Sequence, residues 1–183
     1  MSSSRCLNVR ALRGTRVVPT LMLRIKIDAS KRMKTVFNKV SSKDMCGRYD
    51  NLIPPDAYAG LFRPARIPRS NFPPRYNIAP TDQIPIIRVD PRDGERELVM
   101  ARWGLIPFWM NEKPKVPHIN ARAETVHKLP LFREAFVKRR CLIPATGFYE
   151  WQQRDDGKQP YRFRRKDLEP FAFAGVWLSL IHI

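Results

Sequence analysis

Residues 148–165, FYEWQQRDDGKQPYRFRR, predict an antiparallel hairpin and with it the class of the fold. Two runs rich in aromatic residues, 148–152 and 161–165, flank the turn sequence DDGK at 155–158. Such a turn between two β-prone runs is typical of a hairpin. In the first run, alternation places Phe148 and Glu150 on one face of the strand and Tyr149 and Trp151 on the other.

The rest of the chain extends this pattern. We expect further short strands at 84–89, 97–103, 141–145 and 171–177, and short helices at 55–62 and 129–139. Seventeen prolines against eight glycines favour short strands and rigid turns over long helices. The predicted fold class is therefore α+β, with antiparallel twisted sheets in an open, barrel-like core and a few short helices.

The charge of the chain favours a polyanionic partner. Its 183 residues carry a net charge of +17, and nucleic acid is the usual partner of so basic a chain. Residues 1–45 hold 11 of the 34 basic and two of the 17 acidic residues, so the remainder is still at +8.

Cysteine usage excludes two common frameworks. The three cysteines, Cys6, Cys46 and Cys141, are odd in number and form no CxxC pair, which favours neither a disulfide scaffold nor a zinc site. We expect no metal at His118 or His127, no cofactor, and a reducing compartment. No apolar run approaches the roughly 18 residues of a membrane helix, so no membrane partner is expected.

The chain is predicted to have three parts. Residues 1–44 form a basic extension that is either disordered, a transit-like segment, a genuine basic arm, or upstream sequence translated from the wrong start. Residues 45–177 form the domain. Residues 178–183, LSLIHI, match a translated sequencing adapter or, alternatively, a natural edge strand.

The segment Met45-Cys46-Gly47 looks like the start of a protein. If Met45 is removed, Cys46 carries a free α-amine on the carbon next to its thiol-bearing carbon. Such a 1,2-aminothiol attacks an aldehyde twice, first through nitrogen to give an imine and then through sulfur to close a thiazolidine ring. An α-amine has an unperturbed pKa of about 7.7–8.0, so a useful fraction is neutral near pH 7.

Five segments together resemble one known family. They are MCGRY at 45–49, RYNIAP at 75–80, RWGLIP at 102–107, INARAET at 119–125 and PATGFYEW at 144–151. In this order they closely resemble the SOS response-associated peptidases, or abasic site processing proteins (the SRAP family), over residues 45–177.

The resemblance implies a protein that binds single-stranded DNA at abasic sites and crosslinks itself to the ring-opened sugar aldehyde, after autoproteolysis exposes the cysteine. It implies a nucleophilic role for Cys46, an orienting role for Asn120 and general acid/base catalysis by Glu150. It also implies DNA contacts from six residues, namely Arg48, Arg122, Asn77, Pro80, Trp103 and Trp109. A monomer in the bacterial cytoplasm, associated with the nucleoid, would fit these roles.

Each role has a plainer alternative. Glu150, among aromatic neighbours, is expected to have a raised pKa that suits imine chemistry, but it is equally a candidate surface carboxylate. Asn120 suits a turn cap, Trp103 and Trp109 suit core packing more than base stacking, and Cys141 suits a buried structural thiol. The chain also ends before the family's downstream histidine.

Two other functions remain open. The N-terminal cysteine could serve a peptidase or amidase that acts without DNA. Alternatively, the chain is an inactive basic fragment that binds single-stranded DNA with no preference for abasic sites.

Overall fold

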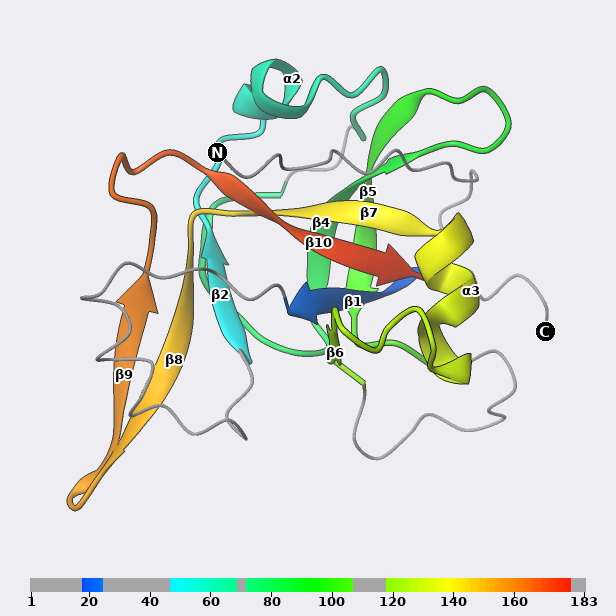
Figure 1. The fold of residues 1–183 in the computed structure, drawn as a ribbon. Coiled ribbons are helices and arrows are strands. Elements are labelled where there is room, and N and C mark those ends of the chain that lie inside the picture. Colours follow the sequence, from blue (N-terminus) through cyan, green and yellow to red (C-terminus); the bar gives the residue numbers. More distant parts are fainter. Residues whose placement is uncertain (1–17, 25–46, 69–71, 107–117, 179–183) are drawn as a thin grey trace.

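Two sheets built mostly of antiparallel strands make up the fold (Figure 1). The structure, a computed structural model, describes residues 18–24, 47–68, 72–106 and 118–178, with the backbone alone for 18–24. The larger sheet has the order β10-β7-β4-β5-β1-β6, and the smaller sheet has the order β3-β2-β8-β9. The two sheets do not close into one barrel. The predicted α+β class with dominant antiparallel strands is confirmed.

The strands of the larger sheet are β1 (Val18–Arg24), β4 (Gln83–Val89), β5 (Arg96–Trp103), β6 (Asn120–Arg122), β7 (Arg140–Ala145) and β10 (Phe171–Trp177). Those of the smaller sheet are β2 (Arg48–Asn51), β3 (Arg75–Ile78), β8 (Gly147–Arg154) and β9 (Gly157–Phe163). The chain passes from one sheet to the other at Thr146, where β7 bends sharply into β8 (Figure 1). The amide of Thr146 donates to the carbonyl of Asp50 over 3.0 Å, which ties this bend to β2.

The main core lies between the two sheets. Its buried side chains alternate inward along both, as the period of a strand requires. They are Tyr49, Ile78 and Phe148 from the smaller sheet and Ile84, Ile86, Ala101, Trp103, Cys141, Ile143, Ala145 and Trp177 from the larger. Cys141 is thus buried in this core, as the sequence predicted.

Two helices were predicted from sequence within the described residues, and both are present. Helix α2 is Ala57–Phe62 and helix α3 is Pro130–Lys138. Proline at the start of α3 fits because the first helical N–H needs no intrahelical partner. Phe132 and Ala135 of α3 are buried against Val176 of β10 and their neighbours, so α3 covers one end of the larger sheet (Figure 1).

The hairpin boundary differs from the prediction. Strand β9 begins at Gly157 rather than at residue 161, and Arg154 pairs with Gly157 across the turn. The tight connection is possible because Gly157 has a φ of 134°, which side-chain-bearing residues rarely adopt. The turn was therefore predicted correctly, but each of the two flanking strands extends closer to the turn than predicted.

Strand β1 lies inside the segment 1–44, for which disorder was one expectation. Residues 18–24 of this segment pair with β5, β6 and β10. The sequence VPTLML contains β-branched and long apolar residues that suit a strand. That residues 1–44 are upstream sequence translated from the wrong start stays a prediction.

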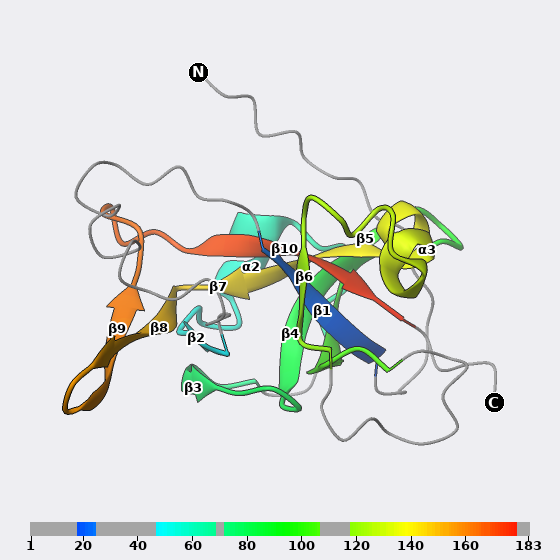
Figure 2. The same ribbon diagram turned by 60° about the horizontal axis from the view of Figure 1, so that its bottom comes forward.

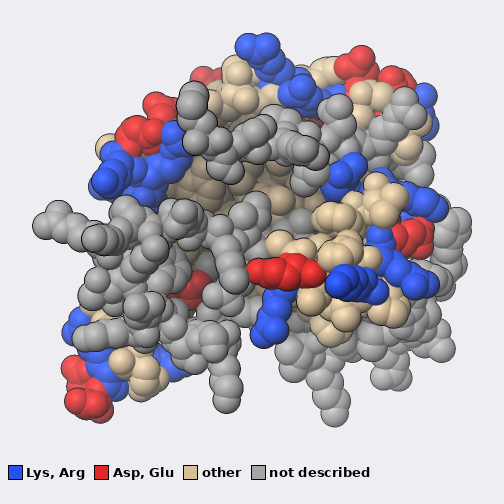
Figure 3. All heavy atoms as spheres, viewed as in Figure 1, with Lys and Arg blue, Asp and Glu red and all other residues tan. Residues whose placement is uncertain are grey.

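The described surface mixes charges of both signs. In the view of Figure 3, basic side chains lie among acidic ones over the described part of this face rather than in one patch. Within the described ranges, no helix is long and apolar enough to cross a membrane.

Candidate active site

Strand pairing sets Arg48 beside the strand that carries Glu150. Strands β2 and β8 are antiparallel, with Arg48 opposite Tyr149 and Tyr49 opposite Phe148. Glu150 is only 6% exposed, so the alternative of a surface carboxylate is wrong. Because the two strands are antiparallel, Gly47, just before β2, is level with Glu150, which follows Tyr149 on β8. Cys46 and Trp109 lie outside the described residues.

A hydrogen bond joins the side chains of Arg48 and Asn77. The Nη1 group of Arg48 donates to Oδ1 of Asn77 over 2.8 Å, which links β2 to the exposed edge strand β3. The hydroxyl of Tyr149 donates to the carbonyl of Tyr76 over 3.0 Å. Tyr76 is 69% exposed, so this edge presents a cation, an amide and an aromatic residue together. Sequence reasoning missed Tyr76, although it stands next to Asn77 in the RYNIAP motif.

Trp103 lies in the core and connects the neighbours of three predicted site residues. It is 0% exposed, so in this structure its ring cannot stack on a base, and the packing alternative holds. Its carbonyl accepts the amide of Thr81, next to Pro80, over 2.7 Å. Its indole Nε1–H donates to the carbonyl of Ile119, next to Asn120, over 2.8 Å.

The indole of Trp103 also contacts β2, the strand that carries Arg48. The ring of Tyr49 meets the ring of Trp103 edge-on, with 5.6 Å between centroids. Trp103 therefore contacts two other motifs, at Tyr49 and Ile119, and also Thr81, the residue that follows the RYNIAP motif. Pro80 itself is half-buried, and the following Thr81 has a φ of 79°, an uncommon value for a β-branched residue.

Asn120 and Arg122 lie on the three-residue strand β6. Asn120 is half-buried in the strand rather than in a turn, so the turn-cap alternative does not hold. Arg122 is exposed, and its carbonyl accepts the amide of Val126 over 2.9 Å, which begins the turn that leads to α3. An exposed guanidinium on a fixed strand suits contact with phosphate.

A buried carboxylate holds the smaller sheet together. Asp50 is 0% exposed and accepts two hydrogen bonds from Arg162, Nε to Oδ2 at 2.7 Å and Nη2 to Oδ1 at 2.9 Å. The hydroxyl of Thr146 also donates to Asp50. A Cβ at Gly147 would lie 2.8 Å from Asp50 Oδ2, so this position has room only for glycine unless the cluster shifts. The sequence carried no signal for this cluster, because Arg162 is 112 residues from Asp50.

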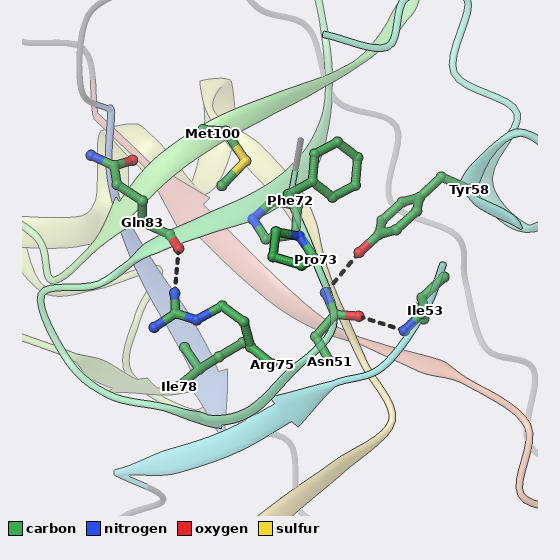
Figure 4. Close-up of a pocket in the computed structure, with 10 residues that line it drawn as sticks. Asn51, Ile53, Tyr58, Phe72, Pro73, Arg75, Ile78, Gln83 and Met100 are labelled. Atoms are coloured by element: carbon green, nitrogen blue, oxygen red, sulfur yellow. Dashed lines mark hydrogen bonds between the residues drawn. The ribbon is translucent and has the colours of Figure 1, made fainter. Parts of the chain in front are cut away.

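A pocket near α2 is distinct from these residues (Figure 4). It is lined by Asn51, Ile53, Tyr58, Phe72, Pro73, Arg75, Ile78, Gln83, Pro85 and Met100, none of which was predicted as a site residue. Its polar groups bond to one another: the Asn51 amide donates to the Tyr58 hydroxyl over 2.7 Å and accepts from the Ile53 amide. Burial raises the pKa of Tyr58 to about 12, so the phenol stays neutral.

Metal ligands are not gathered in the part of the chain that the structure describes. No group of three His, Cys, Asp or Glu side chains lies close enough there to hold an ion. His118 and His127 are both exposed.

Comparison with known proteins assigns the chain to a family. Residues 45–181 match the sequence profile of the SOS response associated peptidase (SRAP) family. The chain belongs to the SRAP family. The resemblance seen in the five sequence motifs is thereby confirmed.

Named SRAP relatives come from bacteria and vertebrates. "Abasic site processing protein YoqW" of Bacillus subtilis is 40% identical over 136 residues, which cover 73% of this chain and 60% of the relative. "Abasic site processing protein YedK" of Escherichia coli is 32% identical over 136 residues, 72% of this chain and 59% of the relative. "Abasic site processing protein HMCES" of Xenopus tropicalis is 37% identical over 101 residues, 49% of this chain and 30% of the relative. The chain thus spans about 60% of the length of these bacterial SRAP relatives.

Solved structures agree with this SRAP assignment. A protein and a phage-related protein, both from Bordetella bronchiseptica, superpose with TM-scores of 0.57 at 33% and 32% identity. Each match covers 72% of this chain, and 63% and 60% of the respective partner.

Proposed function

We propose that this SRAP chain processes abasic sites in single-stranded DNA by linking Cys46 covalently to the damaged sugar. The single observation that carries the proposal is the arrangement around Trp103. This buried indole and its backbone hold the residues next to Pro80 and Asn120 and contact the neighbour of Arg48. The printed names of the SRAP relatives supply the substrate, an abasic site.

The reaction requires a free α-amine on Cys46, and hence a cut between Met45 and Cys46. The amine attacks the C1′ aldehyde of the ring-opened sugar and gives a carbinolamine. Loss of water gives the protonated imine, and the sulfur then adds to the imine carbon as the thiol gives up its proton. Aldehyde and aminothiol thus yield a thiazolidine and one molecule of water.

Glu150 suits the proton transfers of this sequence. Its carboxylic acid protonates the departing hydroxyl of the carbinolamine, and the resulting carboxylate takes the proton back from the thiol. Its 6% exposure keeps competing water away from the carboxyl group. Asn120 orients the amine and the sugar, while Arg48 and Arg122 hold the flanking phosphates.

The proposal predicts an adduct that depends on the lesion. The chain, processed so that Cys46 is its first residue, should form a complex with single-stranded DNA bearing one abasic site that survives denaturation. Intact-mass analysis should show the mass of protein plus DNA minus one water. The same oligonucleotide with a tetrahydrofuran in place of the abasic sugar lacks the aldehyde and should give none; an equal adduct with it would refute the proposal.

Replacing Arg48 by alanine should weaken binding to single-stranded DNA about three- to tenfold and lower the slope of log K against log salt by about 0.7, because one phosphate contact is lost. Fluorescence anisotropy at several salt concentrations measures both quantities. Arg133, exposed on α3, gives the matched control because Arg133→Ala removes the same charge outside the site. Equal losses in the two variants would show that only total charge matters.

A further inference from the structure

Strand β3, at the edge of the smaller sheet, runs on into β4 of the larger sheet through a short loop, residues 79–82 (Figure 2). Within this loop, Thr81 is exposed and has a φ of 79°. A β-branched residue rarely adopts this left-handed conformation, which costs free energy and persists only where the surrounding structure holds it. Contacts around the loop must therefore outweigh the strain at Thr81.

Backbone hydrogen bonds fasten the loop to the end of β5. The Thr81 amide donates to the Trp103 carbonyl over 2.7 Å, and the Trp103 amide donates to the Asp82 carbonyl over 2.9 Å. The Asp82 amide donates in turn to the Ala79 carbonyl over 3.2 Å. Because Trp103 is fully buried, these bonds anchor the loop on the main core.

The side chain of Asp82 closes the loop from within. Its Oδ2 atom accepts the Ala79 amide over 3.0 Å and also pairs with Nη2 of Arg75, the first residue of β3. The Nη1 group of Arg75 donates to the carbonyl of Gln83, the first residue of β4, over 3.0 Å (Figure 4). The Arg75–Asp82 pair therefore joins the two ends of the segment 75–83.

The joined segment contains Asn77 and Pro80, from which the family resemblance implies DNA contacts, and the exposed Tyr76. The side chains of the Arg75–Asp82 pair are 40% and 30% exposed, and an ion pair so open to water contributes little to global stability. A carboxylate close to a DNA-binding surface also repels phosphate. Neither global stability nor charge accounts for Asp82 at this place, whereas the conformation of the loop does.

We propose that Asp82 is a positioning residue for this edge: it holds the loop 79–82 in the conformation that sets Asn77 and Pro80 toward DNA. It acts through the loop backbone and through Arg75, without touching the DNA itself. The consequence for DNA rests on the proposed function, whereas the hold on the loop does not.

Two variants of equal charge test this role on the full chain. Asp82→Ala removes every acceptor of the side chain, whereas Asp82→Asn keeps an oxygen that can accept the Ala79 amide. In fluorescence anisotropy, Asp82→Ala should bind intact single-stranded DNA about fivefold more weakly than the parent, as the loss of one net hydrogen bond implies. Asp82→Asn should lie between the two. The slope of log K against log salt should keep its parental value, since no phosphate contact is lost.

A role in charge alone predicts the opposite sign. Without Asp82, the Arg75 guanidinium would be released to bind phosphate, so both variants would bind DNA more tightly, with a slope steeper by about 0.7. The control is Asp167→Ala, which removes an exposed carboxylate from Arg165 and should bind DNA at least as tightly as the parent. Affinity of Asp82→Ala equal to or above the parent's, or equal affinities of the two Asp82 variants, would overturn the proposal.

Hydrogen exchange tests the hold on the loop without DNA. In Asp82→Ala, the Thr81 amide should exchange faster than in the parent although its own acceptor is untouched, while β8 and β9 keep their protection. Unchanged exchange at Thr81 would overturn the proposal. If β8 and β9 also lose protection, that variant has unfolded globally, and Asp82→Asn decides instead. A parent that binds no single-stranded DNA would end the proposed function, while the exchange result would still decide the hold on the loop.

Discussion

Replacing Cys46 by serine should abolish the denaturation-stable adduct with abasic DNA while leaving non-covalent binding intact. Serine keeps the α-amine, so the variant still forms an imine with the sugar aldehyde. It lacks the sulfur that closes the thiazolidine, and an imine hydrolyses when the complex is denatured. Denaturing electrophoresis should show no complex, while anisotropy with intact single-stranded DNA should give the parent's affinity.

Borohydride distinguishes loss of sulfur from loss of the site. Reduction of the imine should restore a stable complex for Cys46→Ser, because the reduced amine no longer hydrolyses. The thiol control is Cys141→Ala, which removes a buried thiol far from the terminus in sequence and should leave the adduct unchanged. A stable adduct of parental yield in Cys46→Ser without reductant would refute the role of the thiol.

The alternative functions give different results in the same assays. A peptidase or amidase that uses the N-terminal cysteine would turn over its substrate without DNA. An inactive basic fragment would bind intact and abasic DNA equally and form no adduct with either. The comparison of abasic, tetrahydrofuran and intact oligonucleotides therefore separates all three functions.

The local parts of the fold were predictable from sequence. The turn DDGK and the alternation in FYEW predicted the β8–β9 hairpin, because turn chemistry and side-chain period act over a few residues. Helices α2 and α3 were expected within a residue or two of their observed ends for the same reason. The family motifs also indicated Arg48 and Asn77, which the structure joins by a hydrogen bond.

The missed features depend on long-range pairing. From sequence, β1 looks like part of a basic tail. Its strand conformation depends on its pairing with β5, β6 and β10, which the sequence does not show. Strand β6 is too short to show a period. The exposure of Tyr76 follows from which face of strand β3 meets the other sheet, and the RYNIAP motif does not specify that face.

Replacing Asp50 by alanine should destabilise the protein by about 2–4 kcal/mol. Removal of one member of a buried charge pair costs about 3–5 kcal/mol because the other charge loses its partner. The expected cost is lower here because the Arg162 side chain is 34% exposed, so water can solvate its charge after Asp50 is removed. The hydroxyl of Thr146 would also lose its acceptor. For a chain of this size the melting temperature should fall by about 5–15 °C, which calorimetry or circular dichroism measures.

The pair Arg165–Asp167 is the matched control for this substitution. Its side chains are 53% and 50% exposed, so Asp167→Ala should cost about 0–1 kcal/mol although it also removes a carboxylate from an arginine. Equal destabilisation in the two variants would contradict a structural role for Asp50. The site should respond as well, because Asp50 ties β2, which carries Arg48, to β9 and to the Thr146 bend before β8. Well below the melting temperature, Asp50→Ala should therefore crosslink abasic DNA more slowly than Asp167→Ala, since the register that sets Arg48 opposite Tyr149 is less firmly held.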